Sequence, residues 1–183
     1  SLNLISAGAG ITHIGTRMEG LAETSINSPF MEYAYDGTTF NRMTMNSISA
    51  NVDYQHLWAG NPDRSFILSY QFSGSPSAND TENTFSSPAG MNLNLTDRRA
   101  DGKTNSLSHT AQADFTTPLG RGKNHTFSTG LKFIGRHNYS DSRNFVYDGT
   151  EFVYTPEGSL EYDFYNNIGA AYAEYSGSFG KFS

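Results

Sequence analysis

The sequence predicts an all-β protein: an antiparallel up-and-down meander of about six to eight long strands, with short turns at one end and long loops or hairpins at the other, forming a barrel or a barrel segment. Three observations predict this fold. Apolar and polar side chains alternate with a period of two in several segments, which marks a strand with two different faces. Short and long connections alternate along the chain. Aromatic residues, which suit a pleated surface, make up 14 % of the chain, and the strong helix formers show no helical period.

Six segments are predicted strands. The segments at about 3–14 and 164–176 alternate less clearly than the four between them. In each of those four, every second position is mostly apolar or aromatic, and the positions between are mostly polar or charged. The apolar sets are Ile48, Ala50, Val52, Tyr54 and Trp58; Phe66, Leu68, Tyr70 and Phe72; Leu107, Ala111, Ala113 and Phe115; and Phe127, Leu131 and Phe133.

A sheet with one apolar and one polar face suits two structures. A soluble sandwich or barrel turns its apolar face inward, whereas a membrane barrel turns that face outward to lipid. Periodicity alone does not say which side meets water. The charged residues of the four clear strands fall on the polar side, and they are Asp53, Asp114, Lys132 and Arg136.

Connection lengths favour the membrane barrel. Outer-membrane barrels have short periplasmic turns and long extracellular loops, whereas loops beyond about 12–15 residues are uncommon in compact soluble domains. The predicted strands run about ten residues or more, the length that a tilted strand needs to cross a membrane. The short connections are 61–64, 117–124 and 177–181, and the long ones are 15–46, 74–103 and 138–163.

Aromatic residues cluster beside the short turns. The pairs are Trp58 with Phe66, Phe115 with Phe127, and Tyr175 with Phe179. Rings gathered at one level are typical of the aromatic girdle at a membrane interface. The alternative is that they cap the core of a soluble sandwich.

Two long connections contain Asp-Gly, a dipeptide that favours tight hairpin turns. It occurs at Asp36-Gly37 and again at Asp148-Gly149, each flanked by aromatic residues. We therefore expect both connections to stand up as β-hairpins beyond the barrel wall. Their aromatic side chains either contact a ligand or only stabilise the hairpins as cross-strand pairs. The candidate ligand-contact residues are Tyr33, Tyr35, Phe40, Phe145, Tyr147, Phe152 and Tyr154.

Composition and motifs argue against several other functions. A net charge of -6 and a pI near 5.2 argue against a nucleic-acid partner. Without cysteine, the chain has no thiol catalysis, iron–sulfur cluster or cysteine-based zinc site. The glycine-rich runs 8–10 and 120–123 complete no nucleotide-binding motif, and the histidines lack metal-ligand spacing. We expect no catalytic residue, no metal and no cofactor, and hence no enzyme.

Short motifs in the second half carry a family resemblance. The segment 164–183 contains an Ala-x-Tyr strand, at Ala171-Tyr172-Ala173-Glu174-Tyr175, followed by the turn Gly177-Ser178-Phe179-Gly180-Lys181. Residues 130–136 read as the preceding strand, and 48–56 with 65–74 as an upstream hairpin. Over most of residues 44–183 this pattern resembles the outer-membrane β-barrel family of TonB-dependent receptor-like proteins of the Bacteroidetes, specifically a C-terminal barrel fragment.

The resemblance implies a role in nutrient uptake. Residues 1–183 would form a single β-barrel segment excised from a longer protein, because both ends look cut. That segment would be part of the barrel wall of a TonB-dependent-type transporter or receptor in the bacterial outer membrane. Its implied partners are outer-membrane lipid, a small nutrient and a partner lipoprotein. The isolated segment would self-associate, because its apolar face and strand edges are uncovered. The alternative is a soluble β-barrel or sandwich that binds a ligand, or a surface adhesion module.

Overall fold

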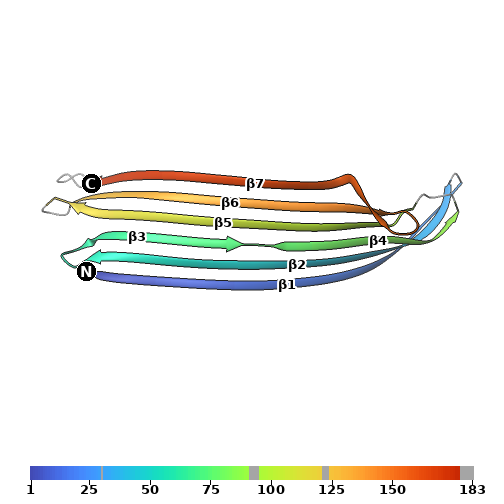
Figure 1. Cartoon of the computed structure of the whole chain (residues 1–183), viewed down its shortest axis with the longest axis horizontal. Coiled ribbons are helices and arrows are strands. Elements are labelled where there is room, and N and C mark those ends of the chain that lie inside the picture. Colours follow the sequence, from blue (N-terminus) through green and yellow to red (C-terminus); the bar gives the residue numbers. More distant parts are fainter. Residues whose placement is uncertain (30, 91–94, 121–123, 178–183) are drawn as a thin grey trace.

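The computed structural model describes residues 1–29, 31–90, 95–120 and 124–177. Within them, seven strands form one antiparallel sheet in the order β1-β2-β3-β5-β6-β7, with β4 paired to β2 and β5 (Figure 1). The predicted all-β antiparallel meander is confirmed. No helix long and apolar enough to cross a membrane occurs in the described residues. The strands are β1 (Leu2–Ser28), β2 (Met31–Trp58), β3 (Asn61–Gly74), β4 (Ser77–Gly90), β5 (Arg98–Leu119), β6 (His125–Tyr147) and β7 (Phe152–Gly177).

Strands β3 and β4 together occupy one position between β2 and β5. They lie end to end (Figure 1), and the break between them falls at Ser75 and Pro76. Proline has no N–H to donate to a strand ladder. The break is nevertheless bonded on both sides: the Asn46 amide donates to the Pro76 carbonyl and the Ser75 amide donates to the Ser106 carbonyl, each at 2.9 Å. The sheet is therefore continuous across the break.

The strands are much longer than a membrane requires. Strand β2 has 28 residues, which at about 3.3 Å per residue is roughly 90 Å, whereas about 9–11 residues suffice to cross a bilayer. The predicted long loops at 15–46, 74–103 and 138–163 are therefore wrong in large part. Most of their residues are paired strand, as at Asp80 with Asp101 and Lys103 with Asp141. The sequence of these segments resembles that of loops because polar residues are suitable on both faces of a strand that has water on both sides. Such a strand needs no alternation of apolar and polar residues.

The two Asp-Gly dipeptides behave differently. Asp36-Gly37 is not a turn, because Asp36 pairs with Glu23 within the β1–β2 ladder, which continues to Ser28 and Met31. Asp148-Gly149 is a turn, as predicted: Tyr147 pairs with Phe152, and Gly149 has a φ of 101°. The hydrogen bonds of the long, unshifted β1–β2 ladder stabilise the extended conformation more than the turn preference of this dipeptide opposes it.

The turn at Asp148 is fixed by its carboxylate. The Glu151 and Thr150 amides donate to Asp148 Oδ1 at 3.0 and 2.8 Å. These hydrogen bonds, that from Glu151 first, lower the pKa of Asp148 below its usual value. The hairpin tip is therefore held by a charged group at neutral pH.

The short turns lie close to their predicted positions. The β2–β3 turn falls at residues 59–60, two residues before the predicted 61–64, because Trp58 already pairs with Asn61. The β5–β6 turn begins at Gly120, inside the predicted 117–124, with Leu119 paired to His125. The predicted turn at 177–181 falls outside the described residues after Gly177.

Candidate functional site

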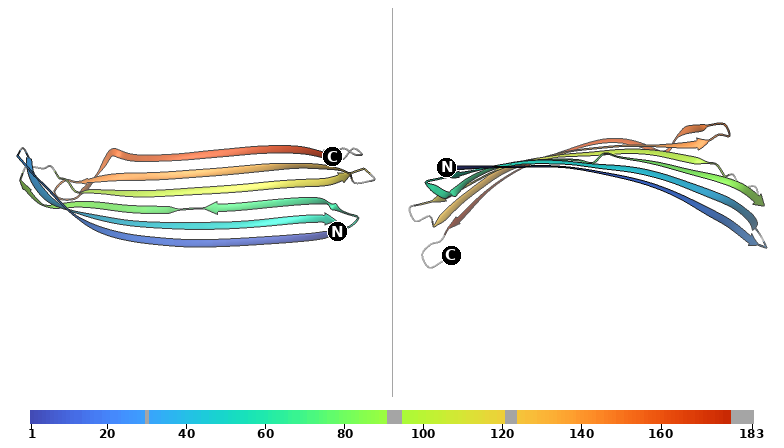
Figure 2. Two further views of the ribbon diagram at one scale, coloured as in Figure 1. Left: turned by 180° about the vertical axis from the view of Figure 1, so that it is seen from behind. Right: turned by 90° about the horizontal axis from the view of Figure 1, so that it is seen from below.

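The sheet is a single layer without a core. Among the described residues no hydrophobic side chain is buried, and large ones such as Ile5 and Leu131 are 75 % and 63 % exposed. A soluble sandwich or barrel would cover one face of the sheet by a second layer or by closure. Figure 2 shows one curved layer, seen from behind and from below. Within the described residues, the apolar face of the sheet is therefore exposed, and no second layer of the protein packs against it.

Strand register aligns the apolar positions into rows across the sheet, which confirms the predicted alternation. We call this surface the apolar band. In β7, whose alternation is less clear in the sequence, Ala171 lies in the band. From β1 to β7, its three central rows are Ile5, Tyr54, Leu68, Ala113, Leu131 and Ala171; Ala7, Val52, Tyr70, Ala111, Phe133 and Gly169; and Ala9, Ala50, Phe72, His109, Gly135 and Asn167.

The apolar band has the height of a membrane. In β3 it extends from Phe66 to Gly74, roughly 26 Å along the strand at about 3.3 Å per residue. A strand tilted as in outer-membrane barrels needs about 9–11 residues to cross the bilayer, and the nine residues from Phe66 to Gly74 meet that need. Only about a third of β2 is therefore needed to cross the bilayer.

Aromatic rings line the edge of the apolar band nearest the short turns. The Trp58 ring lies 6.1 Å from Phe115 and 4.3 Å from His56, and the Tyr175 and His125 rings stack at 5.7 Å. Across the strands, Phe66 pairs with Phe115, and Phe127 pairs with Tyr175. The rings predicted to form a girdle are thus brought to one level, except for Phe179, which lies outside the described residues.

The opposite face is polar along the same membrane-level rows. A furrow of about 400 Å³ on this face is lined by Asp53, Gln71, Gln112 and Lys132, among others. The Gln112 amide donates to Asp114 at 2.7 Å. The four charged residues predicted on this face therefore lie on one surface that carries both signs of charge.

Tyr172 is a polar-face residue that the sequence pattern did not single out. Its hydroxyl donates to Asp114 Oδ1 at 2.9 Å, reaching across β6 from β7. Its ring lies over Gly130, where an added Cβ would overlap both the ring and the Asp114 carboxylate. The pairing of a glycine with a tyrosine on the neighbouring strand is the only signal that could have found this contact.

The structure divides the seven candidate ligand-contact residues between the two faces. The β1–β2 and β5–β6 registers are unshifted, so the alternation of faces holds along the whole strands. Tyr33 and Tyr35 lie on the polar face. The other five lie on the side of the apolar band, and they are Phe40, Phe145, Tyr147, Phe152 and Tyr154.

On the polar face, Tyr33 and Tyr35 meet a third ring. Tyr33 and Tyr35 stack at 6.3 Å, and Phe85 of β4 contacts Tyr35 edge-on at 5.8 Å. The backbone amide of Phe85 donates to Asp97 at 2.8 Å, which fixes this part of β4. Phe85 was missed because its segment was expected to be a loop.

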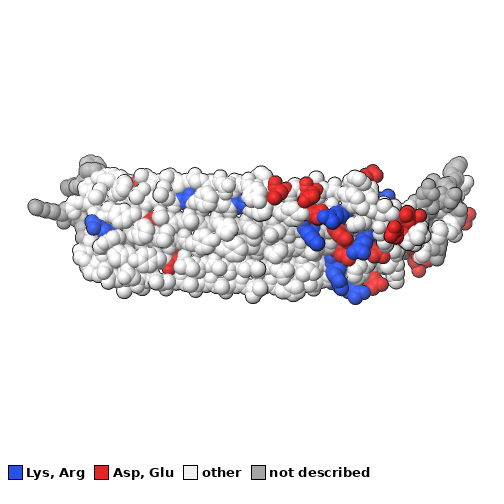
Figure 3. Space-filling view, viewed as in Figure 1, with Lys and Arg blue, Asp and Glu red and all other residues white. Residues whose placement is uncertain are grey.

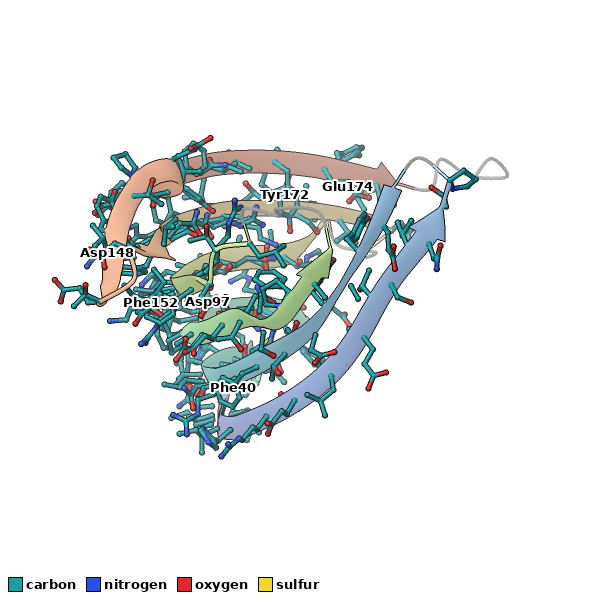
Figure 4. The ribbon with its side chains drawn as sticks, turned by 90° about the vertical axis from the view of Figure 1, so that its right-hand side faces the viewer. Phe40, Asp97, Asp148, Phe152, Tyr172 and Glu174 are labelled. Carbon is teal, nitrogen blue, oxygen red and sulfur yellow. The ribbon has the colours of Figure 1, made fainter. Side chains whose placement is uncertain are left out.

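The remaining candidates form separate contacts. Phe145 and Tyr154 lie 6.0 Å apart, and Tyr147 and Phe152 lie 5.4 Å apart, so these four make cross-strand pairs of the β6–β7 hairpin. Phe40 lies under the Arg17 guanidinium at 5.0 Å. Figure 4 shows Phe152 on β7 and Phe40 on β2, and these two strands are not neighbours in the sheet. The seven candidates therefore do not form one site.

The fold and its two faces define a segment of the wall of a membrane-spanning β-barrel. The sequence matches the model of an outer membrane protein beta-barrel family over residues 59–183. The chain belongs to this family, and its location is the outer membrane. A search of curated proteins found no match.

Proposed function

We propose that this chain is part of the barrel wall of a TonB-dependent-type transporter that takes up a small nutrient. The observation that carries the proposal is the polar face at membrane level, where Asp53, Asp114 and Lys132 stand beside an open furrow. Charges of both signs at that depth suit a water-filled lumen rather than a packed interior.

A wide lumen is further supported by the shape of the sheet. Its six neighbouring positions curve gently, and β1 and β7 are its two edges (Figure 2). Small barrels fill their interior with side chains, whereas a passage for solutes needs many more strands. The coupling to TonB rests on the resemblance of segments 130–136 and 164–183 to receptor-like barrels.

The nutrient would first contact the polar-face ring cluster of Tyr33, Tyr35 and Phe85. Flat rings supply contact area at low entropic cost, and their faces suit the apolar faces of sugars and aromatic groups. The four rings on the other face of the β6–β7 hairpin would not contact the nutrient. They stabilise the hairpin as cross-strand pairs. The partner lipoprotein implied by the resemblance would bind at this extracellular end.

The test uses the full-length protein in its own cells. Strains with and without its gene are grown on a panel of glycans, peptides and iron chelates as sole sources. The deletion strain should lose growth on one of them, and a strain without TonB should lose the same growth. Normal growth of the deletion strain on every source, or uptake that persists without TonB, would contradict the proposal.

A matched pair of variants then tests the contact cluster. Tyr35→Ala should raise the nutrient concentration needed for half-maximal growth by about tenfold, the loss typical of one aromatic anchor. Tyr154→Ala, on the other face, should leave it unchanged. Equal effects of the two substitutions would show that the ring cluster of Tyr33, Tyr35 and Phe85 does not contact the nutrient.

A further inference from the structure

A pocket with a mostly apolar surface, to which Lys103 and Asn105 contribute polar groups, opens on the lipid-facing side where β3 gives way to β4. It has a volume of about 330 Å³, and its walls come from β2, β4, β5 and β6. We call it the break pocket. Its lining residues include Thr44, Asn46, Ala78, Lys103, Asn105 and Tyr139.

The break pocket lies directly above the apolar band. Asn105 is the next residue on the same face of β5 after Leu107, and Tyr139 is the next after His137 on β6. Successive positions on one face of a strand are about 7 Å apart. The pocket therefore sits at the level where lipid headgroups meet the protein, on the side opposite the lumen.

Lys103 is the cation of this pocket, and the acidic residues next to it form ion pairs with other residues. Asp141, opposite Lys103 on β6, lies 2.8 Å from Arg143, and Asp101 lies 3.1 Å from Arg99. Within the described part of the chain, Lys103 has no ion pair. It is therefore available for an anion from outside the protein.

Asn105 adds a second, independent sign of a ligand. Its Oδ1 is buried and has no hydrogen-bond partner among the described residues. A buried acceptor without a partner is unfavourable, because it has lost its hydrogen bonds to water and gained none in the protein. A ligand that offers a hydroxyl or an ammonium group would satisfy it while its phosphate meets Lys103.

The surface below the pocket fits an acyl chain. A furrow of about 500 Å³ runs through the apolar band, with Ala111 and Ala113 of β5 between Leu68 and Leu131. Strand β5 thus carries Lys103 and Asn105 at headgroup level and small side chains at hydrocarbon level, all on one face. Figure 3 shows the charged side chains gathered around β4, with few over the part formed by β3.

From this arrangement we infer that the break pocket binds the headgroup of a phosphate-bearing membrane lipid. The Lys103 ammonium contacts the phosphate, Asn105 accepts from a headgroup hydroxyl or ammonium, and an acyl chain runs down the apolar band toward Ala111. This role is separate from uptake, because it depends only on the lipid-facing side of the wall.

The test uses full-length protein in nanodiscs of phosphatidylcholine with one tenth phosphatidylglycerol, whose headgroup carries a phosphate and free hydroxyls. Native mass spectrometry counts each lipid retained after release. Wild type should retain phosphatidylglycerol over phosphatidylcholine, and Lys103→Gln should lower that preference about fivefold, the effect of one basic residue near a membrane surface. Asn105→Leu should also lower it, without a change of charge.

Lys132→Gln is the matched control, because it removes the same charge from the opposite face of the sheet. The preference should survive in Lys132→Gln, and all variants should keep the gel mobility of the folded barrel. Equal loss in Lys132→Gln, or no preference in wild type, would overturn the inference. Displacement of the lipid by millimolar glycerol phosphate would overturn it too, because the pocket would then bind a free phosphate.

Discussion

At the scale of single residues, the contact between Gly130 and Tyr172 shows how a glycine shapes the lumen wall. The missing side chain leaves room for the ring, and the ring in turn carries its hydroxyl to Asp114. Period-two alternation could not find this contact, because the segment 164–176 alternates too weakly to assign Tyr172 to one face. The register settles the matter by placing Ala171 in the apolar band and Tyr172 on the polar face.

Gly130→Ala should therefore destabilise the barrel. The added Cβ overlaps the ring of Tyr172 and the Asp114 carboxylate, and forced overpacking costs about 1–3 kcal/mol. Urea unfolding of the full-length protein in lipid vesicles measures the change. Gly169→Ala is the control, because an added Cβ there meets nothing within 4 Å. A loss of stability as large in Gly169→Ala would mean that the steric argument is wrong.

At the scale of elements, the sequence predicted membrane-level strands well and extracellular strands poorly. The membrane-level part of β3 lies between lipid and water, so its two faces need different residues, as Leu68 and Ser69 illustrate. The distal part of β1 has water on both sides, so a stretch such as 15–28 needs only hydrogen-bonded pairing. Polarity then no longer separates a strand from a loop. The same reason explains why Phe85 was missed.

The two Asp-Gly dipeptides give a direct test of that distinction. Gly149→Val should weaken the β6–β7 hairpin by about 1–2 kcal/mol, because Gly149 has a φ of 101° that a side chain rarely adopts. Gly37→Val should be nearly neutral, since Gly37 is extended in β2 and its nearest neighbour would be 3.7 Å away. Protection of hairpin amides from hydrogen exchange in full-length protein measures both. A greater loss of amide protection in Gly37→Val than in Gly149→Val would indicate that Asp36-Gly37 forms a turn after all.

At the scale of the whole molecule, the sheet has two open edges and one uncovered apolar band. Strands β1 and β7 each pair on one side only within the described residues. Exposed edges and contiguous apolar surface both promote association. In an outer-membrane barrel, lipid would cover the band and further strands of the closed barrel would cover the edges.

The isolated chain of 183 residues should therefore need detergent to remain dispersed. Light scattering coupled to size exclusion would show oligomers or precipitate in plain buffer and defined particles in detergent. Replacing Leu131 and Phe133, both exposed in the apolar band, with Ser should reduce association. A monodisperse monomer of the unmodified chain in plain buffer would show that the band is covered in some other way.

The length of β2 has a consequence for what meets this protein first at the cell surface. From Ile48, at the top of the apolar band, the strand continues to Met31, roughly 55 Å at about 3.3 Å per residue. Hairpins of this reach rise well above the lipid. An antibody, a phage or a neighbouring cell would touch the tips before it touched the bilayer. The hairpin tips are thus the part of the wall that lies farthest from the bilayer, so a particle approaching from outside the cell would reach them before the apolar band.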